Sequence, residues 1–153
     1  MCGIFSYIGI LPNNVNRYLN TIQYRGPDKT NSKFYNNVYL GFHRLSINDL
    51  TDNGLQPMTY KNCDLICNGE IYNFRELQQR HHFVTQSSSD CEVILHMYTT
   101  FGINETVKQL DGVFAFVLYD RNIDRLFAAR DPYGVRPLFM GNNEEKELFI
   151  SSE

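Results

Sequence analysis

The chain opens with Met1-Cys2-Gly3-Ile4-Phe5, which places a cysteine directly behind the initiator methionine at the start of a short apolar segment. Removal of Met1 gives Cys2 a free α-amine beside its thiol. An α-amine has a pKa of about 7.7–8.0 and a thiol a pKa of about 8.5, so the amine can take the thiol proton directly or through one water. The segment therefore predicts a nucleophile that carries its own general base. The alternative is that Cys2 is simply a small residue.

The composition indicates one ordinary domain and argues against nucleic acid or a membrane as a partner. The chain has 153 residues and a formal net charge of −3, and a domain of this length buries roughly 68–70% of its unfolded surface. No apolar run approaches the roughly 18 residues of a membrane span, and the first residues lack a basic region followed by an apolar one, so we expect no signal peptide. We expect a cytoplasmic protein whose four cysteines are thiols. Cys63 and Cys67 lack a second pair of metal ligands, so we expect no metal.

Strands and helices come in groups rather than in strict alternation, which favours an α+β domain with largely antiparallel sheets. Asn13 or Asn14 is the expected cap of the first helix. A brief strand over 65–67 is expected to stop at Asn68-Gly69, and the end at Glu153 indicates a chain cut just after a strand. Apolar spacing predicts helices over 13–24, 72–80, 91–101 and 105–110. Short apolar runs predict strands over 2–8, 38–47, 65–67, 113–119, 125–129, 138–140 and 148–150.

Asn68 and Gly69 can supply two hydrogen-bond donors at the end of an apolar strand. A glycine there allows a ligand to approach the backbone closely. Its N–H and the Asn68 side-chain amide would form the oxyanion hole that acyl transfer requires. The alternative is a plain β-turn, because Asn-Gly is a favoured hairpin dipeptide.

Two charged residues can bind the ends of an amino acid. Arg44 lies at the end of a strand among apolar neighbours, where a guanidinium can donate two hydrogen bonds to a carboxylate; a surface arginine or a structural ion pair is the alternative. Asp90 can pair with an ammonium group, or it can simply stabilise the start of a helix. Together with Cys2 and the donors at 68–69, these residues describe a site for an α-amino acid with a side-chain amide. That ligand is glutamine.

Seven motifs resemble those of class II glutamine amidotransferases and follow the family's order over essentially the whole chain. MCGIF (1–5) is similar to the family's first residues, and YRGPD (24–28) to its usual HRGPD. Five further motifs resemble the asparagine synthetase branch in particular: FHRLSI (42–47), NGEIYN (68–73), SDCEVI (89–94), LDGVFAF (110–116) and RDPYGVRPL (130–138).

The resemblance implies an N-terminal nucleophile hydrolase fold, which is an αββα four-layer sandwich of antiparallel sheets. It implies L-glutamine as the substrate and no cofactor or metal for this domain. It also implies a role for each site residue: Cys2 as nucleophile with its amine as base, Asn68 and the Gly69 N–H as oxyanion hole, Arg44 for the α-carboxylate, Glu70 and Asp90 for the α-amino group, main-chain contacts from Leu45 and Ile47, and Arg25 to order the site around Cys2.

The sequence departs from the family in two respects. Tyr24 replaces the common histidine, which we expect to be tolerated because the α-amine is the base. Residues 1–153 contain only a glutaminase domain, expected to be shortened at its C-terminal end, and no Gly-rich phosphate loop. In the family a synthetase domain uses ATP and Mg to activate aspartate, so we expect such a domain in cis or in trans. The resemblance also implies a homodimer as one arrangement.

Two other functions remain open at this point. One is the same glutaminase domain from an amidotransferase that feeds phosphoribosylpyrophosphate or fructose-6-phosphate, and RDP (130–132) alone fits the first of these. The other is a domain that binds glutamine or a partner chain without turnover.

Overall fold

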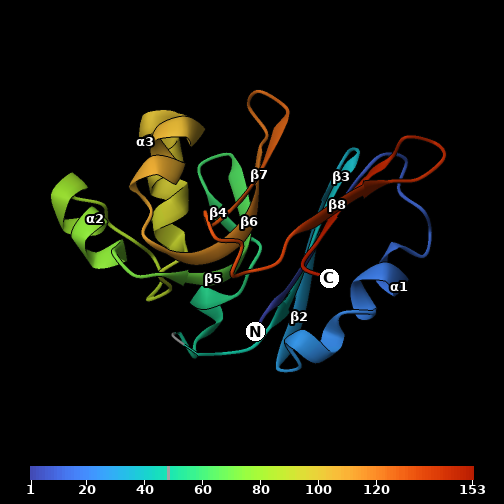
Figure 1. Ribbon diagram of the computed structural model, residues 1–153, viewed down its shortest axis with the longest axis horizontal. Coiled ribbons are helices and arrows are strands. Elements are labelled where there is room, and N and C mark those ends of the chain that lie inside the picture. The colour runs from blue at the N-terminus through green and yellow to red at the C-terminus, as the bar shows by residue number, and fades with distance from the viewer. Residues whose placement is uncertain (48) are drawn as a thin grey trace.

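The computed structural model describes residues 1–47 and 49–153 and contains two antiparallel sheets with helices on their outer sides (Figure 1). The first sheet has the strand order β2-β3-β1-β9-β8 and the second the order β4-β5-β6-β7. The strands are β1 (Gly3–Ile8), β2 (Lys29–Tyr35), β3 (Val38–Arg44), β4 (Met58–Tyr60), β5 (Cys63–Ile71), β6 (Gly112–Asp120), β7 (Arg125–Arg130), β8 (Phe139–Asn142) and β9 (Leu148–Ser151). The helices are α1 (Val15–Asn20), α2 (Phe74–His81) and α3 (Glu92–Gln109), with short 3₁₀ helices at Gln23–Arg25 and Asp52–Gly54.

The two sheets pack face to face through alternate residues of their strands. Successive side chains of a strand point to opposite faces, so Ile4 of β1 faces the second sheet while the next residue faces outward. Ile4, Leu40 and Phe42 of the first sheet join Ile66 and Val117 of the second in one fully buried cluster. Burying side chains of this kind contributes roughly 1.5–3 kcal/mol each. This layer therefore fixes how the two sheets face one another.

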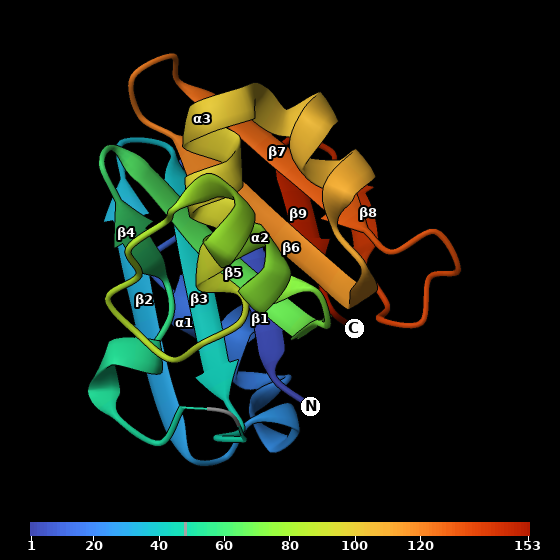
Figure 2. The same ribbon diagram turned by 90° about the vertical axis from the view of Figure 1, so that its left-hand side faces the viewer.

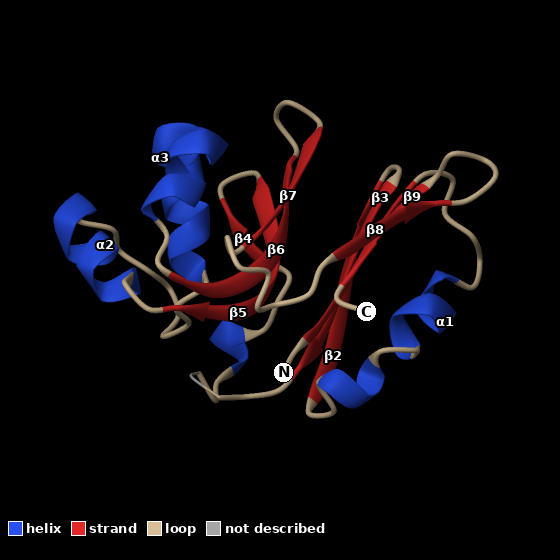
Figure 3. Cartoon of the chain, viewed as in Figure 1, coloured by secondary structure: helices blue, strands red, loops and turns tan. Residues whose placement is uncertain are grey.

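Helices cover the outer face of each sheet and complete four layers. Val15 and Leu19 of α1 pack with Phe5 and Tyr7 of β1. On the other side α2 and α3 pack against the second sheet, and Figure 3 shows α1 on one side of the sandwich with α2 and α3 on the opposite side. The predicted αββα arrangement is confirmed. Over the described residues, no helix is both long and apolar enough to cross a membrane.

α3 bends at Gly102, which has φ 76° and ψ 172° inside an otherwise helical run. The sequence predicts two helices here, over 91–101 and 105–110, and the structure joins them across this glycine. No described atom lies within 4 Å of the place where a Cβ would stand. Glycine is therefore required for its positive φ and not for space.

Three local predictions differ from the structure in their extent, and in the two that concern strands, pairing between strands overrides the local pattern. The first helix covers only Val15–Asn20, and its N-cap Asn14 makes no side-chain capping bond. The strand predicted over 65–67 extends as β5 from Cys63 to Ile71, since β6 pairs with it along its whole length. The pattern missed β2 and β4, which are edge strands with few buried apolar residues.

β1 lies inside the first sheet and is bonded on both sides. It pairs with β3 over its whole length and with β9 from Phe5 onward. The Ser152 N–H donates to the Ile4 carbonyl at 3.0 Å, and the Ile4 N–H donates to Ser152 Oγ at 3.1 Å. Figure 2 shows the two ends of the chain at the same edge of the molecule. Cys2 is thus the residue directly before a firmly held strand.

Candidate active site

One pocket opens where β1 begins and where β5 has an unpaired edge. Eight of the nine residues predicted for the site line it, and the ninth, Arg25, lies beside Cys2. The lining comes from both sheets, from the loop after β3 and from the start of α3. The predicted residues in it are Cys2, Arg44, Leu45, Ile47, Asn68, Gly69, Glu70 and Asp90, and the others include Met1, Asp49, Gly54, Gln56, Cys67, Cys91 and Arg136.

Cys2 is held by the loop that follows β3. The Leu45 N–H donates to Cys2 Sγ at 3.4 Å, and the thiol lies 3.6 Å from the Leu45 carbonyl oxygen. Burial raises the pKa of the Cys2 thiol, while the Leu45 hydrogen bond acts in the opposite direction. The thiol is therefore protonated near neutral pH and needs a base to become a nucleophile.

Arg25 and Met1 flank the nucleophile at the start of the chain. Arg25 Nε donates to the Cys2 carbonyl at 3.2 Å, and its Nη1 pairs with Glu153 at 3.2 Å. Tyr24 donates to the same Glu153 carboxylate and lies outside the pocket lining. Met1 lines the pocket, and its Sδ contacts Arg136 Nη1. While Met1 is present, the Cys2 nitrogen is a peptide nitrogen and cannot act as the base.

Asn68 brings an unused donor to the pocket. It lies in β5 and faces the first sheet, on the same side of the strand as Ile66. The side chain is 2% exposed, yet Nδ2 has no hydrogen-bond partner among the described residues. Leaving a buried amide unpaired costs about 1–3 kcal/mol, so a donor of this kind that lines a pocket can bind an acceptor from a ligand or from water.

Gly69 presents its backbone to the same space. The N–H groups of Cys67 and Ile71 point away from β6 to the open edge of β5, where Gln56 Oε1 accepts the first at 2.5 Å and Asp90 Oδ2 the second at 2.6 Å. Alternate residues of a strand direct their backbone groups to the same side. The Gly69 N–H, between these two, therefore points to this edge and into the pocket that Gly69 lines.

The local conformation at 68–69 is that of a strand and not of a turn. Asn68 pairs with Ala115, and Gly69 with Phe114. A Cβ on Gly69 would stand 2.4 Å from the Val113 carbonyl oxygen, which explains the glycine by close approach of the neighbouring strand. The β-turn alternative is therefore excluded.

Arg44 is held by hydrogen bonds to backbone carbonyls and forms no salt bridge with an acidic side chain among the described residues. It is 5% exposed, its Nη1 donates to the Thr51 carbonyl at 2.7 Å, and its Nη2 donates to the Asp49 carbonyl. A Cβ on Gly54 would stand 2.9 Å from Arg44 Nη2, so the small residue leaves room for the guanidinium. Arg44 places a positive charge in the pocket wall that can attract a carboxylate, and the nearby Asp49 carboxylate offsets part of this charge.

Acidic groups line the same pocket as Arg44, at the start of α3 and the end of β5. Asp90 is 3% exposed and accepts the Ile71 N–H, which fixes its carboxylate at the edge of β5. Glu70 and Ile47 also line the pocket, and both are exposed. The pocket lining thus contains both cationic and anionic groups, which match the two ends of an α-amino acid.

Sequence reasoning missed two residues that shape the pocket. The Asp49 carboxylate accepts the Thr51 hydroxyl and N–H and the Ser88 N–H, and these bonds, led by that of the Thr51 hydroxyl, lower the pKa of Asp49. It thereby ties the loop after β3 to the segment before α3. The Asp-x-Thr pattern at 49–51 is a local signal for such a turn. Gln56 has no local signal, since its partner is a distant strand.

The full chain, residues 1–153, matches the family model of the glutamine amidotransferase domain. The chain therefore belongs to the glutamine amidotransferase domain family. Similar proteins include the glutamine-hydrolysing asparagine synthetase of Mesocricetus auratus, which is 43% identical over 100% of this chain and 28% of that protein. The protein of the same name from Homo sapiens is 42% identical over the same shares. A probable glutamine-hydrolysing asparagine synthetase of Acanthamoeba polyphaga mimivirus is 38% identical over 97% of this chain.

These relatives narrow the class within the family. The chain is a glutamine amidotransferase domain homologous to one found in glutamine-hydrolysing asparagine synthetases. It spans a little over a quarter of the length of the curated relatives it matches, 28% in the Mesocricetus auratus protein.

Proposed function

We propose that this domain, once Met1 is removed, hydrolyses L-glutamine to L-glutamate and ammonia through a thioester on Cys2. The observation that carries the proposal is the unpartnered, buried Asn68 amide beside the Gly69 N–H in the pocket that also holds the Cys2 thiol. Two donors next to a nucleophile are the arrangement that stabilises a tetrahedral oxyanion.

The α-amine of Cys2 takes the thiol proton, and the sulfur attacks the side-chain carbonyl carbon of glutamine. The carbonyl oxygen becomes an oxyanion bound by Asn68 Nδ2 and the Gly69 N–H. The amine returns the proton to the leaving nitrogen, the C–N bond breaks and ammonia departs. Water then attacks the thioester, the C–S bond breaks, and glutamate and the free thiol are released.

The charged side chains that line the pocket select and orient the substrate. Arg44 binds the α-carboxylate, and Asp90 with Glu70 binds the α-ammonium group. Main-chain contacts from Leu45 and Ile47 complete the binding, and Arg25 holds the Cys2 carbonyl so that the terminus keeps its orientation. The observation in support is that Arg44, Glu70 and Asp90 line the same pocket as the Cys2 thiol.

The ammonia is used by a synthetase domain, in cis or in trans, that makes asparagine from aspartate with ATP and Mg. The names of the relatives, which join glutamine hydrolysis to asparagine synthesis, support this acceptor. ATP and Mg belong to that second domain, and the glutaminase domain itself uses no cofactor. The four free cysteines favour a reducing compartment such as the cytoplasm. Formation of a homodimer stays a prediction.

The test is release of ammonia and glutamate from glutamine by the chain with and without Met1. An N-terminal fusion cleaved directly before Cys2 gives the processed form, and intact mass verifies it. We expect turnover and stoichiometric labelling by a glutamine-like electrophile only in the processed form, with both lost in Cys2→Ala. Glutamine binding without turnover by the processed chain would contradict the proposal and favour a binding module.

A further inference from the structure

One residue connects the sheet that carries the nucleophile to the strand that carries the oxyanion donors. Gln56 is 4% exposed and lines the pocket. Its backbone carbonyl accepts Asn31 Nδ2 of β2 at 3.1 Å. Its side chain accepts the Cys67 N–H at 2.5 Å through Oε1 and donates to the Cys67 carbonyl at 3.2 Å through Nε2.

The Gln56 carboxamide occupies the position of a strand residue. β4 pairs with β5 only as far as Met58 opposite Leu65. The next residue of β5 whose backbone N–H and carbonyl point to this edge is Cys67. There the carboxamide makes both bonds that a neighbouring strand would make. The next residue whose backbone groups point to this edge is Gly69, and they are directed into the pocket. Gln56 thus closes the edge of β5 up to the residue before Asn68 and leaves the next position open.

We infer that Gln56 is a positioning residue that holds Asn68 and Gly69 at the correct distance from Cys2 by clamping β5 at Cys67 and anchoring it to β2. The inference rests on the proposed glutaminase reaction. Gln56 acts through Cys67, and a displacement of reacting groups by about 1 Å can cost on the order of 100-fold in rate. The effect falls on the oxyanion donors, which act in the transition state, and much less on Arg44, which lies at the end of β3 and is held by the loop that follows it.

The experiment compares Gln56→Met, which keeps the length of the side chain but removes both hydrogen bonds, with two control variants. Tyr98→Phe deletes a buried hydrogen bond to Asp120 Oδ2 of 2.8 Å on the far side of the second sheet, and Gln79→Met makes the same exchange at an exposed position of α2. All are measured on the full chain after removal of Met1. We expect kcat for glutamine to fall about 10- to 100-fold in Gln56→Met, with KM within about threefold, and no such fall in the controls.

A second readout separates misplaced donors from a damaged nucleophile. Alkylation of Cys2 by iodoacetamide uses the thiol but no oxyanion hole, so its rate in Gln56→Met should stay within about twofold of the wild type. If Gln56→Met does not fold, Asn31→Ala, which removes only the link to β2, should lower kcat in the same direction by a smaller factor.

Three results overturn the inference: kcat of Gln56→Met within twofold of the wild type, an equal fall in Tyr98→Phe, or an increase in KM with kcat unchanged. In the Asn31→Ala arm, an unchanged kcat overturns it. A wild-type chain that releases no ammonia would instead contradict the proposed function, so the two failures are distinguishable.

Discussion

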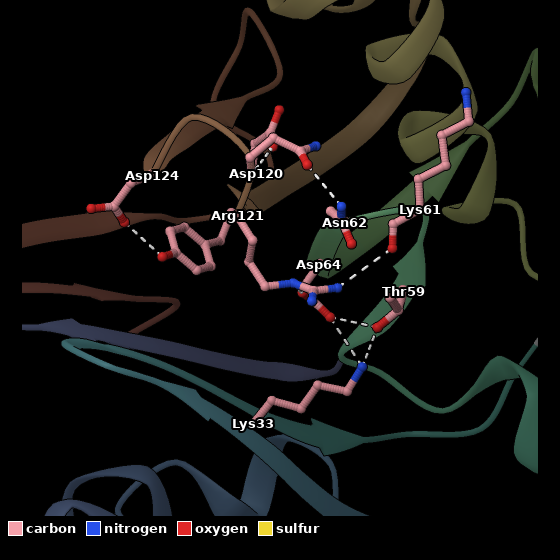
Figure 4. A network of polar contacts seen from close by, with 10 residues as sticks. Lys33, Thr59, Lys61, Asn62, Asp64, Asp120, Arg121 and Asp124 are labelled. Carbon is pink, nitrogen blue, oxygen red and sulfur yellow. Dashed lines mark hydrogen bonds and ion pairs between the residues drawn. The ribbon is translucent and has the colours of Figure 1, made fainter.

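The inner face of β5 carries two buried polar residues, Asp64 and Asn68, whose surroundings are opposite in character. Asp64 is 0% exposed and accepts Lys33 Nζ at 3.0 Å, Thr59 Oγ1 at 2.5 Å and Arg121 Nε at 2.9 Å. Figure 4 shows Lys33 reaching from the first sheet to this carboxylate. Asn68, four residues along the same face, has an amide nitrogen with no partner among the described residues.

The difference separates a stabilising position from a functional one on a single strand. At Asp64 the protein supplies two cationic side chains and a hydroxyl group, so the buried charge is compensated and the contact with Lys33 joins the two sheets. At Asn68 the amide donor is unpaired among the described residues, and under the proposed function the substrate supplies the acceptor. Variants at the two positions should therefore affect different quantities.

The largest effect is expected from Asn68→Ala, and it should fall on rate alone. Loss of one oxyanion donor typically lowers kcat by about 10²–10³. Because Nδ2 has no partner in the protein, the free energy of unfolding should change by less than about 1 kcal/mol. Steady-state ammonia release and urea denaturation measure the two quantities. An unchanged kcat would remove Asn68 from the oxyanion hole.

Asp64→Ala should give the reverse result, a loss of stability with little loss of kcat per folded molecule. Breaking a buried ion pair usually costs about 3–5 kcal/mol. Lys33 and Arg121 are each 32% exposed, so water can solvate them in part, and we expect about 2–4 kcal/mol. The measurement is the urea midpoint and slope. A kcat lowered more than tenfold in fully folded protein would show that the two ends of β5 are coupled.

Glu92 of α3 is, like Asp64, a buried carboxylate whose hydrogen-bond partners the protein supplies, and its contribution to stability depends on pH. Burial opposes its ionisation, but hydrogen bonds from His96, from the Ser87 hydroxyl and from the N–H groups of Gln86 and Ser87 prevail and lower its pKa to about 2. A lowered carboxyl pKa stabilises the fold above the unfolded value of about 4.3, and this is lost as pH falls towards 2.

Glu92→Gln should therefore lower the free energy of unfolding by up to about 3 kcal/mol above pH 5. The difference from the wild type should shrink between pH 4 and 2. Urea unfolding at several pH values measures it, and a difference that does not depend on pH would contradict the assigned cause.

The smallest effect on stability is expected at an ion pair whose two side chains are already solvated by water. Arg80 and Glu76 form an exposed i,i+4 pair on α2, with side chains 55% and 61% exposed. Such pairs contribute about 0.3–0.5 kcal/mol, so Arg80→Ala should shift the urea midpoint only slightly and leave kcat unchanged. A large shift of the urea midpoint would mean that the exposure of a polar pair does not predict how much the pair contributes to stability.

Local sequence was a sufficient guide where motif and packing agree. The central strands β3 and β6 and the helix face at Val93 and Ile94 follow from apolar runs that are in fact buried. The residues brought to the pocket were likewise predicted by their chemistry and by the motifs around them. A short motif keeps its residues together in space whatever the rest of the chain does.

Long-range pairing set what local sequence could not predict. Asn68-Gly69 has the composition of a turn, and only pairing with β6 keeps it extended. Gln56 is an ordinary polar residue until β5 is placed beside it. Both depend on partners distant in the chain, and a single sequence has no local pattern for such partners.

The position of Cys2 directly before β1 restricts where residues can be added or deleted in this chain. Chain termini are usually the most tolerant of insertions, but β1 has a neighbour on each side. One residue inserted between Cys2 and Ile4 would move the thiol by one step of a two-residue period and turn it towards α1. One residue retained before Cys2 would acylate its amine. A change in length next to Cys2 should therefore be more damaging than a conservative substitution within β1.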